Sequence, residues 1–253
     1  MKHTIKNIFK MKIHFFIGSL LLILFLFGCK EMQPLFETAG QIAQSQMAPS
    51  QEKTSQAIKL ALDKGVKQAV SQLGRHNAFY QSAFKIPLPN QLQSAGKKAR
   101  ALGLDSYIDS FEESMNRAAE KAVPVAADIL QNSIQQMSLQ DVVNIMQGRD
   151  DAATQFFKRT SRRQIFQRFL PIVREKTAEV GVTRQYKKLS SKINTYGALF
   201  GTSMPNNLDL DNYITNKTIN ALFIKVAEKE KNIRANPLSE TSSLLKQVFG
   251  YYK

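Results

Sequence analysis

Few side chains of this sequence could act as a nucleophile or a general base. The 253 residues include no tryptophan, a single cysteine and three histidines. His3 and His14 precede an apolar segment near the amino terminus, so His76 is the one histidine beyond it. It lies in the polar run Gly74-Arg-His-Asn77, which is more typical of a solvated loop histidine than of a catalytic one. The sequence therefore indicates no nucleophile–histidine–acid set, and we assign no catalytic residue.

Metal ions and cofactors are not expected either. Zinc sites need several histidines and cysteines, and beyond residue 29 neither residue type occurs twice. Calcium loops need closely alternating acids with a glycine, whereas Asp209-Leu-Asp211 is a fragment that better serves as a helix cap. Phosphate-binding glycine loops are absent from the sequence.

One carboxylic acid alone could still cleave a glycosidic bond. Glu113 and Ser114, with Asn116 and Ala118, are similar to the catalytic Glu-Ser helix of lytic transglycosylases, in which one acid protonates the glycosidic oxygen and later acts as a base. A glycine-rich segment follows that helix in those enzymes, but here the chain continues as AEKAVPVAADIL. We interpret the match as chance, and a wall hydrolase using Glu113 or Glu120 is the last-ranked alternative.

A polar cluster is predicted on the same segment. Asn116, Arg117 and Glu120 lie within one helical turn, and Asn116 and Glu120 share a face at i and i+4. Arg234 and Asn236, much later in the chain, could reach that face. A buried ion-pair network that sets helix register is the favoured interpretation, ahead of a ligand site.

A second cluster is cationic. Lys158, Arg159, Arg162 and Arg163 fall within two helical turns, and no acid occurs between Lys158 and Arg174. Like charges at i, i+4 spacing repel one another. Two interpretations stay open here, a phosphate-binding patch and a solvated helix face.

Helices must position all of these residues. From about Thr54 onward, apolar residues recur at three- and four-residue steps, and no alternating strand pattern of useful length occurs. The sequence predicts a single all-α bundle of about eight helices over residues 53–253. An extended connector is expected at 86–89, a kink or a new helix at Pro124, a capping box at 138–141, and a helix cap at Asp150 or Asp151.

The amino terminus is typical of a bacterial lipoprotein. Four lysines precede a 13-residue apolar stretch, Phe15 to Phe27, which is too short to span a bilayer. It ends in Leu26-Phe27-Gly28-Cys29, which resembles a lipobox. The resemblance implies a signal peptide over residues 1–28 and acylation of Cys29, followed by a flexible tether over residues 29–52.

The charge balance limits the partners. The chain carries 35 basic and 20 acidic residues, and loss of residues 1–28 removes four lysines and no acid, which lowers the net charge from +15 to +11. An exported protein meets anionic lipid heads and lipopolysaccharide rather than nucleic acid, so no nucleic-acid partner is expected. Lys30 stands where enteric lipoproteins of the inner membrane have aspartate, which favours the outer membrane, and we expect the protein to face the periplasm. Lys30-Glu31 also resembles the surface-export signals of some other bacteria, so a surface-exposed orientation stays open.

Several short blocks occur in order over about residues 55–250. They are KIPLP at 85–89, MNRAAE at 115–120 with Pro124, GRDDAAT at 148–154, FLPIV at 169–173, YIT at 213–215, ALF at 221–223, EKNIRANP at 230–237 and LKQVFG at 245–250. Together they resemble an exported bacterial domain-of-unknown-function family, number four-one-nine-seven (DUF4197). The resemblance implies a helical envelope protein, often lipidated, with no assigned activity.

The function expected from these patterns is binding or scaffolding by a lipid-anchored envelope protein. Its partners would be the membrane, through acylated Cys29, and an anionic lipid, lipopolysaccharide or an envelope protein, through the basic helix surface. Two alternatives belong to other classes: a periplasmic carrier of an apolar ligand, which needs an enclosed apolar cavity, and the wall hydrolase, which needs an acid in an open cleft.

Overall fold

A computed structural model of the chain describes residues 48–197, 205, 208–236 and 242–251. The chain divides into two compact units, residues 1–48 and 49–253, and the description concerns the second. The predicted signal peptide, Cys29 and most of the predicted tether lie outside the described residues. Helix α3 begins at Gln51, inside the last part of the segment predicted as tether.

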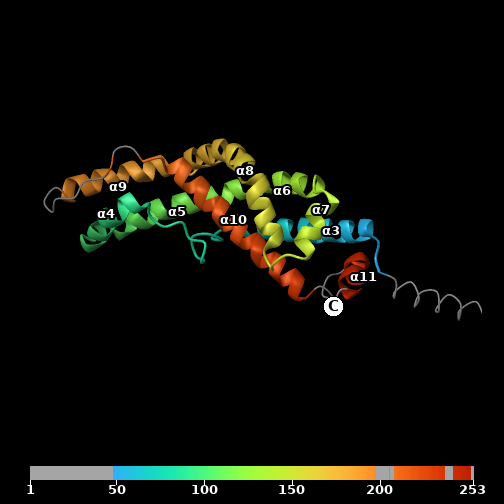
Figure 1. The fold of residues 1–253 in the computed structure, drawn as a ribbon. Helices are drawn as coiled ribbons and strands as arrows, with labels where there is room; N and C mark the ends of the chain where they lie inside the picture. Colours follow the sequence, from blue (N-terminus) through green and yellow to red (C-terminus); the bar gives the residue numbers. More distant parts are fainter. Residues whose placement is uncertain (1–47, 198–204, 206–207, 237–241, 252–253) are drawn as a thin grey trace, which may run out of the picture. The chain divides into compact units, whose positions relative to one another are not determined.

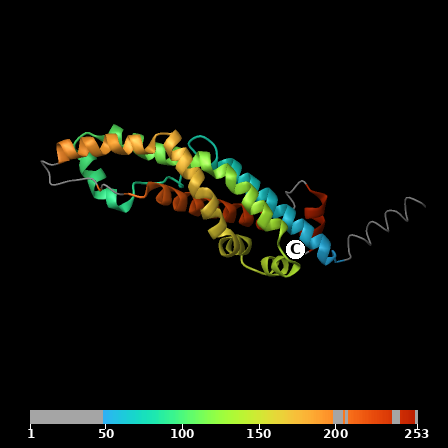
Figure 2. The ribbon, with the colours of Figure 1, turned by 90° about the horizontal axis from the view of Figure 1, so that it is seen from above.

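The all-α prediction is confirmed (Figures 1 and 2). The described residues contain no strand, and none of their helices is both long enough and apolar enough to cross a membrane. The elements are α3 Gln51–Leu73, α4 Asn90–Ala101, α5 Asp105–Ala122, the 3-10 turn η1 Val123–Val125, α6 Ala126–Gln135, α7 Leu139–Met146, α8 Ala152–Glu179, α9 Val182–Gly197, α10 Leu210–Ala235 and α11 Ser243–Tyr251.

Local side chains explain several helix ends. The Ser50 hydroxyl accepts the Lys53 N–H at 3.2 Å at the start of α3, and Asp209 accepts the Asn212 N–H at 3.0 Å before α10. The predicted capping box is present, because Ser138 and Asp141 each accept a backbone N–H from the other. Pro124 lies in η1, which separates α5 from α6.

Helix α8 has an unusual buried stripe. Seven of its buried positions recur at a strict four-residue spacing: Ala153, Phe157, Ser161, Ile165, Phe169, Val173 and Thr177. Because one α-helical turn takes about 3.6 residues, such a stripe moves about 40° around the helix at each step. Helix α8 contacts α7, α6, α5 and α9 as well as α10, which lies along it from Ala153 to Thr177. The helix also bends strongly (Figures 1 and 2), as expected where Pro171 removes a backbone hydrogen bond.

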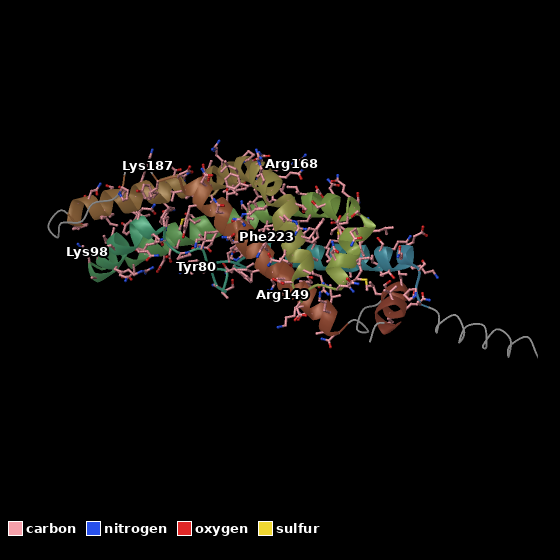
Figure 3. The ribbon with its side chains drawn as sticks, in the orientation of Figure 1. Tyr80, Lys98, Arg149, Arg168, Lys187 and Phe223 are labelled. Carbon is pink, nitrogen blue, oxygen red and sulfur yellow. The ribbon has the colours of Figure 1, made fainter. Side chains whose placement is uncertain are left out.

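Helix α10 crosses the other helices and packs against α8, α3 and α5. It has the same four-residue spacing of buried positions, at Ile214, Thr218, Leu222, Val226 and Glu230. The core between these helices is rich in phenylalanine, and Phe223 of α10 lies near its centre (Figure 3). Glu230 ends this buried stripe with a carboxylate, which needs partners.

Candidate functional site

One face of α5 carries three buried polar residues. Glu112, Asn116 and Glu120 recur at i, i+4 and i+8, and they are 6%, 0% and 4% exposed. They face the connector between α3 and α4, residues 74–89, which has no helix or strand to satisfy its backbone. A buried backbone group without a partner is costly. Each of these three residues, named here the α5 ladder, binds a different part of the connector.

Asn116 holds the extended part of the connector. Its Oδ1 accepts the Ile86 N–H at 2.7 Å, and its Nδ2 donates to the Ile86 carbonyl at 2.9 Å. Nδ2 also donates to the Glu112 carbonyl at 2.7 Å, one turn earlier on α5. The carboxamide therefore acts on Ile86 as a neighbouring strand would, with one donor and one acceptor.

Glu120 holds the start of the connector. Its Oε1 accepts the Phe79 N–H at 3.1 Å, and its Oε2 lies 3.4 Å from Nη1 of Arg117. The other terminal nitrogen of Arg117 contacts Nε2 of His76. A guanidinium can only donate, so His76 accepts through this ring nitrogen. His76 is thus an exposed loop residue, bound to Arg117.

Glu112 completes the ladder with ion pairs. Its Oε2 lies 2.7 Å from Nζ of Lys85 in the connector and 3.7 Å from Nη2 of Arg100 on α4. Arg100 also pairs with Asp109, at 2.8 Å, and with Asp105. These carboxylates raise the pKa of Arg100, and the hydrogen bond from Asp109 is the largest cause.

A second polar network lies elsewhere, at the start of α8. The Glu230 carboxylate accepts the backbone N–H groups of Ala153 and Thr154, each at 2.9 Å, and the Thr154 hydroxyl at 2.8 Å. Arg234 donates to Glu230 at 3.0 Å and to the Ile145 carbonyl, near the end of α7, at 2.7 Å. This pair on α10 therefore fastens the end of α7 and the start of α8.

The structure divides the predicted polar network in two. Arg117 and Glu120 are paired as expected, but Arg234 pairs with Glu230 and not with Glu120. Asn236 ends α10, where its backbone N–H donates to Asn232. Sequence reasoning missed Glu230, although its i, i+4 spacing to Arg234 was a usable signal.

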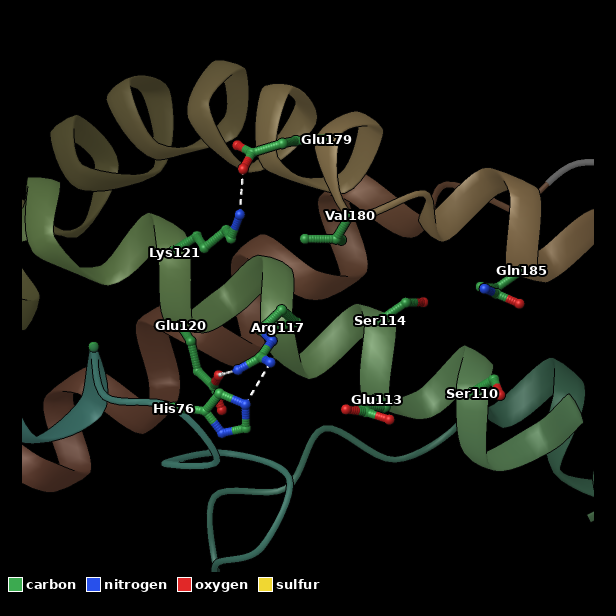
Figure 4. Close-up of a pocket in the computed structure, with 11 residues that line it drawn as sticks. His76, Ser110, Glu113, Ser114, Arg117, Glu120, Lys121, Glu179, Val180 and Gln185 are labelled. Atoms are coloured by element: carbon green, nitrogen blue, oxygen red, sulfur yellow. Dashed lines mark hydrogen bonds and ion pairs between the residues drawn. The ribbon is translucent and has the colours of Figure 1, made fainter. Parts of the chain in front are cut away.

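A cleft of about 550 Å³ adjoins the α5 ladder (Figure 4). Its floor is the α5 face that carries Ser110, Glu113, Ser114 and Arg117, and its walls include His76, Val180 and Gln185. Glu113 is exposed, and no described side chain forms an ion pair or hydrogen bond with it. The cleft thus presents a carboxylate without a partner.

An ion pair crosses one end of this cleft. Lys121 of α5 pairs with Glu179 at the end of α8 (Figure 4). The hydrogen bonds from Lys121 and then from Lys176 hold the pKa of Glu179 below its ordinary value. Both partners are exposed, so the pair contributes little to stability and chiefly marks the boundary of the cleft.

The predicted cationic cluster lies on the first half of α8. Arg159 and Arg163 are exposed, and Lys158 and Arg162 are half-buried. Arg162 donates to Oδ1 of Asn220 on α10 at 2.9 Å, and the Arg159 guanidinium lies 5.8 Å from the centre of the Phe156 ring. None of the four forms an ion pair with a described residue. Arg168 and Lys187 also project outward from α8 and α9 (Figure 3).

The described residues contain no group of three or more histidine, cysteine, aspartate or glutamate side chains that could hold a metal ion.

Comparison with known proteins identifies a family but no characterised relative. No curated protein and no solved structure matches the chain. A family model matches residues 48–250, which include nearly all of the described helices and both polar networks. By this match, the chain belongs to the family described as "Protein of unknown function (DUF4197)".

Proposed function

We propose that the protein is a lipid-anchored envelope protein whose helical unit binds an anionic phospholipid surface through the cationic cluster of α8. It works by binding or scaffolding at the periplasmic face of the outer membrane. The proposal joins the lipoprotein pattern of residues 1–29 to the basic charge of the chain, which is +11 at neutral pH once residues 1–28 are removed.

The geometry of the cationic cluster carries the proposal. At about 100° per residue, Arg159 and Arg163 project away from the buried stripe at Phe157, Ser161 and Ile165. Lys158 and Arg162 lie to one side of them. The four charges therefore share one outer surface. None of them forms an ion pair with a described acid, although the carboxylates of Asp141 and Asp151 attract Arg159 and Lys158 from nearby. A membrane with anionic heads would supply the missing counter-charge.

Energetics explain why an anchor and a patch would act together. Each lysine or arginine near an anionic bilayer contributes about 1 kcal/mol, so four of them give about 4 kcal/mol, which is weak binding. Acyl chains on Cys29 would confine the helical unit to the bilayer surface. A flexible tether of about 20 residues has a reach of roughly 25 Å, so the patch would act at a high effective concentration.

Vesicle binding tests the proposal. The mature chain with Cys29→Ser, which carries no lipid, should sediment with vesicles of phosphatidylcholine containing phosphatidylglycerol and stay free of vesicles of phosphatidylcholine alone. Binding should weaken steeply as salt rises, because the Debye length falls from roughly 30 Å at 0.01 M to about 10 Å at 0.1 M.

A charge-matched control separates the patch from the net charge. Reversal of Lys158, Arg159, Arg162 and Arg163 to glutamate should remove most of the binding. The same reversal at four scattered exposed cations, Lys97, Arg184, Lys188 and Lys231, should remove much less. Equal losses in the two variants, or binding that ignores salt, would overturn the proposal. Binding to lipopolysaccharide but not to phospholipid would reassign the patch to that anion.

A wall hydrolase is the second candidate, because Glu113 lies in an open cleft. Against it, Glu113 is exposed, whereas the general acid of a glycosidase is held in an apolar environment. Glu113→Gln decides between the two: cleavage of purified peptidoglycan by the wild-type chain and not by this variant would establish the hydrolase.

The carrier is not supported by the cleft at α5. A carrier needs an enclosed apolar cavity, and this cleft is open and lined by charged side chains.

A further inference from the structure

We infer that the cleft beside α5 binds a small zwitterion of the α-amino acid class, with the ligand ammonium on Glu113 and the ligand carboxylate on Arg117. The cleft is lined by different residues from the cationic cluster of α8, so the inference does not depend on the proposed membrane contact.

The first observation is a pair of opposite charges that do not bind each other. Glu113 and Arg117 are four residues apart on one face of α5, the spacing at which such side chains usually pair. Arg117 is turned instead toward Glu120 and His76 (Figure 4). Glu113 forms no ion pair with a described residue, so both charges line the cleft separately.

The second observation is that Arg117 is held in place yet keeps donors to spare. A guanidinium has five N–H donors, and Glu120 and His76 occupy two of them. The remaining donors have no acceptor among the described residues. Because two partners already orient the group, a ligand carboxylate would meet a preorganised donor set and would lose less entropy on binding.

The spacing of the two charges limits the ligand. The Cβ atoms of residues four apart on a helix are separated by about 5–6 Å, and both side chains line the same cleft, so one small molecule can contact both of them. An α-amino acid has its ammonium and its carboxylate on one carbon atom. A cationic ligand would leave the spare donors of Arg117 unused, and an anionic ligand would leave Glu113 without a partner.

The remaining lining is suited to a small polar molecule. Ser110, Ser114 and Gln185 offer hydroxyl and amide groups, and Val180 is the apolar side chain of the wall. The volume of about 550 Å³ lies within the range of small-ligand sites. Lys121 and Glu179 already neutralise each other at the boundary, which leaves the Glu113 carboxylate and the spare donors of Arg117 available to a ligand.

Calorimetric titration of the mature chain, residues 29–253 with Cys29→Ser, tests the site. The probes are L-alanine and D-alanine, with N-acetyl-alanine and alanine amide as analogues that lack one charge. At least one alanine enantiomer should bind, and each blocked analogue should bind at least tenfold more weakly. Glu113→Gln should weaken alanine binding at least tenfold, and Glu175→Gln, an exposed acid outside the cleft, should leave it unchanged.

The inference would be overturned if neither enantiomer bound at 20 mM, on the order of the weakest affinities that the titration resolves. It would also be overturned if the blocked analogues bound as tightly as alanine. The same holds if Glu113→Gln left alanine binding unchanged, or if Glu175→Gln weakened it equally. Arg117→Lys keeps the charge beside Glu120 but not the fork of donors, and should weaken alanine and not alanine amide. None of these results depends on vesicle binding, so the two proposals fail or stand separately.

Discussion

At the scale of single residues, the α5 ladder shows how an acid can be structural while its neighbour stays available. Glu120 is buried and bound to the Phe79 N–H and to Arg117, whereas Glu113, seven residues earlier, is exposed. Both line the same cleft. Stability measurements on the two acids should therefore differ even though both lie on α5.

Glu120→Gln should lower stability by about 2 kcal/mol. Breaking a buried ion pair typically costs 3–5 kcal/mol, and the partial exposure of Arg117, 30%, reduces this value. The melting temperature should fall by about 4–8 °C, measured by circular dichroism. Glu113→Gln is the control and should melt within about 1 °C of the wild type. An unchanged melting temperature for Glu120→Gln would contradict the structural role of this residue.

Tyr213 should make stability depend on alkaline pH. Its hydroxyl donates to the Pro87 carbonyl at 2.9 Å, and burial, with a smaller effect of Glu112, raises its pKa from 10.0 to about 12. Between these values the unfolded chain loses the phenolic proton while the folded chain keeps it. Deprotonation then favours the unfolded state, so this contribution is present below pH 10 and is lost as pH rises toward 12.

The matching variant is Tyr213→Phe, which cannot ionise. At pH 8 it should be less stable by about 1 kcal/mol, the value of one hydrogen bond. Urea denaturation should show this difference shrinking as the pH rises from 10 to 12. A difference that stays constant over this range would show that Tyr213 does not titrate between its unfolded and folded pKa values.

At the scale of elements, helix ends in this protein are capped from far along the chain as well as locally. We expected Asp150 or Asp151 to cap α8, but the Asp151 side chain makes no cap hydrogen bond. Glu230 accepts the first N–H groups instead, from 76 and 77 residues away. The local sequence around residue 151 does not predict this cap, because only the packing of α10 on α8 brings Glu230 to the start of α8.

Glu230→Gln should lower stability by about 3 kcal/mol, because it removes the charge at the start of α8 and leaves Arg234 without its ionic partner. The free energy of unfolding in urea measures this loss. Asp151→Asn is the control at the formal cap position and should change the value by less than about 0.5 kcal/mol. If Asp151→Asn were the more damaging change, the assignment of Glu230 as the cap would be wrong.

The helices themselves were largely predictable, and their mutual contacts were not. Apolar spacing predicted the elements, and two prolines predicted the extended connector at 86–89, which α4 follows from Asn90. Asn116 and Glu120 were also recognised as a buried polar pair. Their partners are the backbone groups of Ile86 and Phe79, and no side-chain pattern reveals a backbone partner.

At the scale of the whole molecule, the four-residue spacing of buried positions in α8 explains how this helix packs against five other helices of the described residues, whereas a helix of a regular bundle packs along a single seam. A helix with a fixed apolar face packs along one seam, whereas the buried stripe of α8 moves around the helix, which contacts α10 along its length and also α5, α6, α7 and α9. The opposite surface rotates with it. The cationic cluster lies in the first half of α8, so in the proposed arrangement this half of the helix would face the membrane.

Acylation of Cys29 would attach the whole molecule to the membrane. Cys29→Ser should abolish labelling by radioactive palmitate and leave the precursor uncut by the lipoprotein peptidase, because serine lacks the thiol that accepts diacylglycerol. Labelling and fractionation of membranes measure both effects. A wild-type chain that takes no fatty acid, or a variant that is labelled equally, would contradict the proposed location.

The α5 ladder also determines where the chain tolerates a change of length. Glu112, Asn116 and Glu120 share a face only because they are spaced by four residues, and each holds a different part of the connector. One residue inserted between Glu112 and Asn116 would turn the later residues by about 100°, so Glu112 would no longer share a face with the other two. Gln81 and Ser82 are exposed in a turn, where an inserted residue would be tolerated. Natural variation in length should therefore accumulate in that turn and be excluded from α5.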